Sequence, residues 1–217
     1  MEVEQRPLLR GWSHAVAVVP ALTGAIALVL LTRGSPGKQM SLLVYGAAVT
    51  LLFTVSALYH RVPWSPPWRA VWRRLDHANI FVVIAATYTP IAANMLDGWL
   101  RVAVLTGIWL AALCGASLVA APVELPRPVM AAVYVGVGWL AILIIPVLYT
   151  RLGALGLVML LGGGALYSLG AVMYALRRPR LWPRVFGYHE AFHLLVIAAT
   201  AVFFMVIAAT VLPAGRS

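Results

Sequence analysis

The stretch LLVIAATAVFFMVIAATVL, residues 194–212, decides the class of this protein. Its nineteen residues carry no charge, and an α-helix needs about 20 apolar residues to cross a hydrocarbon core roughly 30 Å thick. The rest of the chain has the same character, because 63% of its 217 residues are hydrophobic and only 10% are charged. Too few polar side chains remain to cover a water-soluble surface, so the composition excludes both a soluble domain and a disordered chain.

Six further apolar stretches are bounded by charged residues, proline or glycine. We therefore predict an all-α, polytopic membrane protein in which residues 1–217 form a single seven-helix transmembrane domain. The predicted spans are residues 12–32, 40–60, 75–96, 100–120, 128–149, 153–176 and 187–212. The first span follows a basic start, as a signal peptide does, but no small-residue cleavage site follows it, so we expect it to be retained.

The basic residues predict the direction of the chain, because Lys and Arg in short loops are kept on the cytoplasmic side of the membrane. Eleven lie at the ends that share a side with the N-terminus: Arg6, Arg10, Arg61, Arg69, Arg73, Arg74, Arg127, Arg177, Arg178, Arg180 and Arg184. Five lie at the other ends: Arg33, Lys38, Arg101, Arg151 and Arg216. We predict a cytoplasmic N-terminus and an outside C-terminus. The net charge of +10 is spread over short loops, which favours anionic lipid headgroups as partners and not nucleic acid.

Ionisable side chains within the predicted spans are few, and each is a candidate functional residue because burying one in hydrocarbon is costly. The predicted topology places His60, Asp76, His189 and His193 at one depth, on the cytoplasmic side. Residues four apart share a helix face, so His189 and His193 can point at a common centre. Neutral imidazoles are ligands that zinc prefers. The sequence therefore predicts a zinc site formed by His60, His189 and His193.

Two further residues at this depth suggest catalysis. A catalytic zinc site typically has three protein ligands and leaves a fourth position for water. Asp76 can accept a proton from such a water as a general base. Ser56 lies one helical turn before His60 and can either hydrogen-bond a neighbour of the metal or stabilise an oxyanion.

Plainer interpretations exist for several of these residues. A histidine at the end of a membrane helix is commonly an interfacial residue with its ring hydrated, and we assign His14 and His77 to that group. Asp76, at the start of a predicted span, can instead cap the helix N-terminus.

A competing motif is H-E-x-x-H, the zinc motif of metalloproteases, which His189-Glu190-Ala191-Phe192-His193 satisfies with Glu190 as the general base. Leu96-Asp97-Gly98 also resembles the L-D-G element of membrane-embedded site-2 type proteases. The predicted topology places Asp97 on the opposite face, about 30 Å away, and those proteases carry the element after the histidines, not before them. We therefore rank proteolysis last and expect Asp97 to lie in the turn between the third and fourth spans.

Three elements of the chain resemble the hemolysin III branch of the progestin and adiponectin receptor family, part of a wider superfamily of seven-span membrane hydrolases that includes alkaline ceramidases. They are Ser56-Ala57-Leu58-Tyr59-His60, then Leu75-Asp76-His77-Ala78-Asn79-Ile80 with Ala86-Thr87-Tyr88-Thr89-Pro90, and finally Tyr188-His189-Glu190-Ala191-Phe192-His193. The resemblance covers nearly the whole chain. It implies zinc held by His60, His189 and His193, with Asp76 and Ser56 beside it.

The leading hypothesis is a zinc protein of the plasma or inner membrane that hydrolyses a lipid amide or ester at the cytoplasmic face, with Asp76 and Ser56 as catalytic residues. Two hypotheses from other classes stay open. One is a non-enzymatic membrane sensor or homeostasis factor with a structural zinc, and the other is a cytolytic membrane protein.

Overall fold

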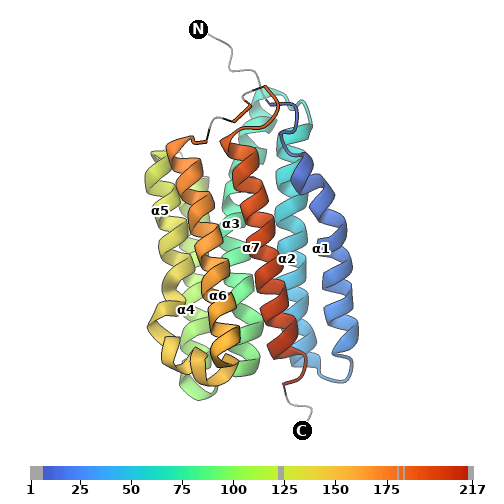
Figure 1. Cartoon of the computed structure of the whole chain (residues 1–217), viewed down its shortest axis with the longest axis vertical. Helices are drawn as coiled ribbons and strands as arrows, with labels where there is room; N and C mark the ends of the chain where they lie inside the picture. The colour runs from blue at the N-terminus through green and yellow to red at the C-terminus, as the bar shows by residue number, and fades with distance from the viewer. Residues whose placement is uncertain (1–6, 122–124, 180, 183, 215–217) are drawn as a thin grey trace.

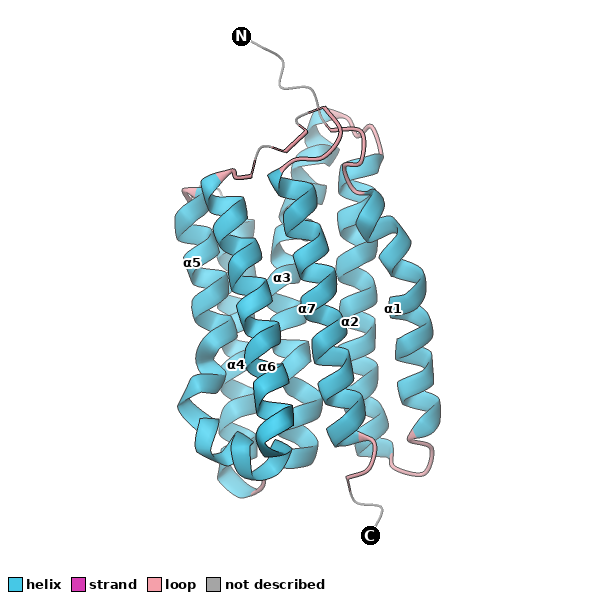
Figure 2. Ribbon diagram, viewed as in Figure 1, coloured by secondary structure: helices cyan, strands magenta, loops and turns pink. Residues whose placement is uncertain are grey.

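The computed structural model describes residues 7–121, 125–179, 181–182 and 184–214, and over these residues it confirms the all-helical prediction. Figure 1 shows the helices standing side by side as one bundle, and Figure 2 shows loops at its two ends. In chain order they are α1 (Trp12–Leu31), α2 (Pro36–Arg61), α3 (Pro66–Met95), α4 (Gly98–Ala120), α5 (Arg127–Gly138), the 3-10 helix η1 (Trp139–Ile144), α6 (Ile145–Leu176) and α7 (Tyr188–Val211). Of the basic residues counted above, Arg6, Arg180 and Arg216 lie outside the described residues.

Six helical stretches in the described part of the chain are long and apolar enough to cross a membrane: α1, α2, α3, α4, α7 and the continuous run Arg127–Leu176. The last of these contains both the fifth and the sixth predicted spans. Its regularity is broken by η1 and by Gly153, whose φ of 71° and ψ of 176° are not helical. The two parts of the run, α5 and α6, pack against each other (Figure 1).

Helix α3 begins earlier than the sequence predicts, at Pro66 and not near residue 75. Proline fits the first turn of a helix because its missing N–H has no intrahelical partner there. The added turns carry Arg69, Arg73 and Arg74. Because these residues are charged, apolar runs alone do not predict this part of the helix. Asp76 consequently lies well inside the helix, behind an N-cap formed by Ser65. The alternative that Asp76 caps this helix is therefore wrong.

Helices α2 and α3 form the centre of the bundle, while α1 and α4 expose most of their residues. Helix α7 also contributes fully buried residues, and α2, α3 and α7 carry all of the predicted site residues. The candidate site therefore lies inside the protein and not on the face that the lipid chains would cover.

The Tyr88-Thr89-Pro90 segment of α3 supports the break between α5 and α6. The Tyr88 hydroxyl donates a 2.7 Å hydrogen bond to the carbonyl oxygen of Gly138 and accepts one of 2.7 Å from the backbone N–H of Ala141. The Trp139 indole N–H donates to Ser168 of α6 at 2.8 Å. The two bonds of Tyr88 satisfy backbone groups beside the 3-10 turn at membrane depth, and the side-chain bond of Trp139 ties η1 to α6.

Helices α1 and α2 approach each other closely at Gly46. A Cβ atom at this position would lie 2.4 Å from the Cβ of Ala25 and 3.0 Å from its Cα. Small residues let membrane helices pack at such short distances. At Gly107 on α4, by contrast, no heavy atom lies within 4 Å of the corresponding position.

We expect Gly46→Ala to destabilise the bundle by about 1–3 kcal/mol, because the α1 backbone must move to admit the methyl group. Gly107→Ala is the matched control and should be neutral or slightly stabilising, since alanine favours a helix over glycine. Thermal unfolding of the two variants in detergent compares them directly. Equal unfolding temperatures for the two variants would contradict the close approach.

Candidate metal centre

The predicted site residues meet at one end of the bundle, the end at which α1 and α7 begin in Figure 1. His60 lies in the last turn of α2, His189 and His193 lie in the first two turns of α7, and Asp76 reaches the same level from α3. Helices α2 and α7 run in opposite directions, so the end of one lies beside the start of the other. His60 and His189 are therefore in direct contact, although 129 residues separate them in the sequence.

The three imidazoles face one another closely enough to share an ion. One ring nitrogen from each of His60, His189 and His193 lies within 4.8 Å of the other two. The Nε2 atoms of His60 and His189 are 3.1 Å apart. Tetrahedral zinc with N–Zn bonds of about 2.0–2.1 Å needs ligand nitrogens roughly 3.3–3.4 Å apart, so small side-chain rotations would complete the geometry.

Burial supports the same interpretation. His193 is 2% exposed, and its Nδ1 atom is buried with no hydrogen-bond partner. Leaving a buried polar atom unpaired costs about 1–3 kcal/mol, and a group of such atoms indicates a missing partner. Uncharged imidazoles that converge in a buried site fit a metal ion. The described residues thus form a possible three-histidine metal site.

Asp76 lies beside this cluster, with Oδ2 3.9 Å from Nε2 of His60. Its side chain is 12% exposed, and it makes a side-chain hydrogen bond with Ser56, which is 2% exposed. The carboxylate can only accept, so the Ser56 hydroxyl donates. Of the two roles predicted for Ser56, this contact favours holding the carboxylate in position.

The prediction that His14 is a hydrated interfacial residue is wrong. His14 is 3% exposed, and its ring stacks on that of His193 with centroids 3.8 Å apart and planes 11° apart. A metal ion lies in the plane of each imidazole that binds it, so two parallel stacked rings cannot both bind one ion. His14 therefore supports His193 from behind. The depth argument that grouped the other histidines would have included His14, which opens the first span on the same side.

Glu190, the candidate protease base, is fully occupied by structural contacts. One carboxylate oxygen accepts a 2.8 Å hydrogen bond from the backbone N–H of Gly187, and the other is ion-paired with Arg10. Asp97 lies at the other end of the bundle, in the α3–α4 turn, and pairs with Arg151. Neither carboxylate joins the histidine cluster.

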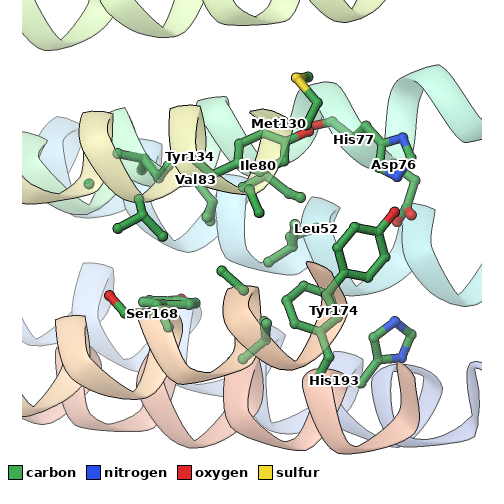
Figure 3. A pocket seen from close by; sticks show the side chains of 18 of the residues that line it. Leu52, Asp76, His77, Ile80, Val83, Met130, Tyr134, Ser168, Tyr174 and His193 are labelled. Carbon is green, nitrogen blue, oxygen red and sulfur yellow. The ribbon is translucent and has the colours of Figure 1, made fainter. Parts of the chain in front are cut away.

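A cavity of about 1820 Å³ opens from the cluster into the bundle. Figure 3 shows Asp76, Tyr174 and His193 at one end of it, with Leu52, Ile80 and Val83 lining its length. The lining continues along α3 to Ala92 and along α6 to Leu148, and most of it is apolar. Typical small-molecule pockets measure about 300–1,000 Å³, so this cavity can hold a larger, mostly apolar molecule.

Comparison with known proteins adds the following findings. The family model described as Haemolysin-III related matches residues 3–204. Hemolysin-3 of Bacillus cereus is 30% identical over 203 residues, which cover 93% of this chain and 90% of that protein. The hemolysin-3 homolog of Bacillus subtilis is 28% identical, with 88% of each chain covered. Human monocyte to macrophage differentiation factor is 28% identical over 90% of this chain and 80% of its own.

We expect the purified protein to carry about one transition-metal ion per chain and His193→Ala to lose it, because the substitution removes one of three ligands. His77→Ala is the control, since His77 is half-buried near Asp76 but outside the cluster. Elemental analysis of the three proteins in detergent measures the ratio. Equal metal content in wild type and His193→Ala would exclude the site.

The stacking of His14 on His193 leads to a second expectation. His14→Ala should weaken metal affinity about tenfold or more, the usual effect of removing a group that orients a ligand. His14→Phe should stay near the wild-type affinity, because a phenyl ring preserves the stack. Competition with a chromophoric chelator gives the affinities. If His14→Phe loses as much metal affinity as His14→Ala, the ring nitrogens of His14 support metal binding and the stacking does not.

Proposed function

The chain belongs to the haemolysin-III-related family, and from this premise we propose that it is a zinc-dependent hydrolase of a lipid amide or ester. The family is related to the progestin and adiponectin receptors. The observation that carries the proposal is a hydrogen-bonded carboxylate, Asp76, 3.9 Å from a three-histidine cluster at the polar end of an apolar cavity.

The residues divide the chemistry between them. His60, His189 and His193 would hold the ion. Zinc bound there would supply a Lewis acid that polarises the acyl carbonyl and favours ionisation of water. Asp76 would accept a proton from the attacking water and return it to the leaving amine or alcohol as the C–N or C–O bond breaks. The Ser56 hydroxyl holds the carboxylate in position. Arg10 and Glu190 fix the start of α7 and so hold His189 and His193 in place.

The cavity supports a lipid as the substrate. Its apolar lining runs from the histidine cluster toward the opposite end of the bundle. An acyl chain placed there buries its apolar surface against side chains such as Leu52 and Val83, and its polar end reaches Asp76. A peptide would have to bury its backbone polar groups against the same apolar wall, which is unfavourable.

We further propose seven crossings, with the site at the cytoplasmic face of a plasma or inner membrane. The break at Gly153 and the packing of α5 against α6 support two crossings within Arg127–Leu176. Among the described residues, nine basic side chains lie at the end of the bundle that carries the histidine cluster, and four lie at the other end. The excess supports a cytoplasmic position for the site.

A structural metal in a non-enzymatic sensor is the second candidate, because the ion would join α2 to α7 and stabilise the bundle. The two candidates differ over Asp76. A structural zinc site usually has four protein ligands and needs neither a base nor space for a substrate, whereas hydrolysis needs both. Asp76 and the cavity provide both, which is why hydrolysis ranks first.

We expect Asp76→Asn to lower turnover of a lipid amide or ester by about 10²-fold or more while zinc content stays unchanged, since a missing general base typically costs that much. Asp97→Asn, at the other end of the bundle, is the matched control. Product formation in liposomes, followed by mass spectrometry, and elemental analysis give the two readouts. Loss of zinc from Asp76→Asn would make Asp76 a ligand. Wild-type protein that binds zinc but forms no product from either lipid class would favour the sensor.

A further inference from the structure

The end of the cavity beside the histidine cluster has a rim of arginines. Seven arginines are among its lining residues: Arg10, Arg69, Arg73, Arg74, Arg127, Arg177 and Arg184. Asp76 is the one carboxylate that lines it within the described part of the chain. Even after Arg10 is neutralised by Glu190, the cationic groups clearly outnumber the anionic one.

Arg73 and Arg127 reach the surroundings of Tyr174, which also include Asp76, from different helices. Arg73 lies three residues before Asp76 on α3, so the two share a helix face about 4.5 Å apart along the axis. Arg127 begins α5, donates a 3.2 Å hydrogen bond to the Tyr188 hydroxyl and lies 5.7 Å from the centre of the Tyr174 ring. Both arginines lie close enough to Tyr174 to interact with it electrostatically. Tyr174 lines the cavity beside Asp76 (Figure 3).

Membrane topology alone does not explain this arrangement. The preference for cytoplasmic Arg is satisfied by any arginine near a helix end, whether or not it reaches a cavity. Arg61 and Arg178 show this, because they lie at the same end of the bundle but do not line the cavity. The arginines of the rim place positive charge where the polar part of a bound lipid would lie.

We propose that the lipid taken by this site carries a phosphate group, which binds between Arg73 and Arg127. Two guanidinium groups can each donate paired hydrogen bonds to phosphate oxygens, a geometry for which arginine is well suited. A phosphate held there lies about one helical turn from Asp76, so the amide or ester bond reaches the histidine cluster and the acyl chain enters the cavity. The inference rests on the proposed function and specifies its substrate class.

The test measures binding to wild-type protein and needs no turnover. Two probes with the same acyl chain are compared, a monoacylglycerol and its phosphorylated form, lysophosphatidic acid. We expect the phosphorylated lipid to bind at least tenfold more tightly. The double variant Arg73→Gln/Arg127→Gln should remove this preference. The control double variant Arg61→Gln/Arg178→Gln removes the same number of positive charges and should keep the preference.

Arg73→Lys with Arg127→Lys separates misfolding from loss of recognition, because it retains the charge and should keep part of the preference. Equal affinity of wild type for both lipids overturns the proposal. Equal loss in the two glutamine variants also overturns it, because the general positive field would then account for the preference. Inorganic phosphate provides a third arm. If inorganic phosphate displaces lysophosphatidic acid when the two are present at equal concentrations, free phosphate and not a lipid headgroup is the ligand of the site.

Failure of the proposed function has a different signature. If lysophosphatidic acid binds with the expected arginine dependence but no amide or ester is cleaved, the hydrolase is rejected and the phosphate site stands. If a neutral lipid is cleaved and the phosphate confers no advantage in binding, the hydrolase stands and the phosphate site is rejected.

Discussion

A polar group at membrane depth must find its partner within the protein, and the arrangement of α2, α3 and α7 follows from that constraint. These helices carry His60, Asp76 and His193, which would each be costly against lipid. The bundle places them together in its interior, at one end, while α1 and α4 bury few of their residues. A metal ion bound there would compensate the burial of His193, whose Nδ1 atom makes no hydrogen bond.

The start of α7 is held in place by side-chain and backbone contacts. Glu190 lies between the two histidines in sequence, and its carboxylate accepts from the Gly187 N–H and pairs with Arg10. The backbone N–H groups of Leu8 and Leu9 donate to carbonyl oxygens of Arg184 and Val185 at 3.0 and 3.2 Å. The segment before α1 is thus tied to the segment before α7, and this tie brings His14 onto His193. In this structure the Glu190 of the H-E-x-x-H pattern caps the start of α7 and pairs with Arg10.

The sequence predicted the helices and the cluster of three histidines because both follow from short-range rules. Apolar length predicts spans, spacing of four residues predicts a shared face, and charge asymmetry predicts depth. The burial of His14 against His193 was not predicted, because a single histidine at a helix end was interpreted as interfacial. Its predicted depth nevertheless matched that of the other histidines. The start of α3 was missed because Arg69 and Arg73 extend the helix beyond its apolar part. The cavity was not predictable, because its volume depends on how side chains from distant helices fill space.

The irregular segment between α5 and α6 explains why the cavity exists. A void of this size in a bundle loses many van der Waals contacts, so regular helices would be expected to close it. Tyr88 prevents this by bonding to Gly138 and Ala141, which fixes η1 in place. Tyr88, Gly138, Trp139 and Ala141 all line the cavity. Because apolar cavities are poorly filled by water, an acyl chain of the proposed substrate would restore the lost contacts. The two hydrogen bonds of Tyr88 on α3 therefore help to maintain the space beside the histidine cluster in which we propose that a lipid binds.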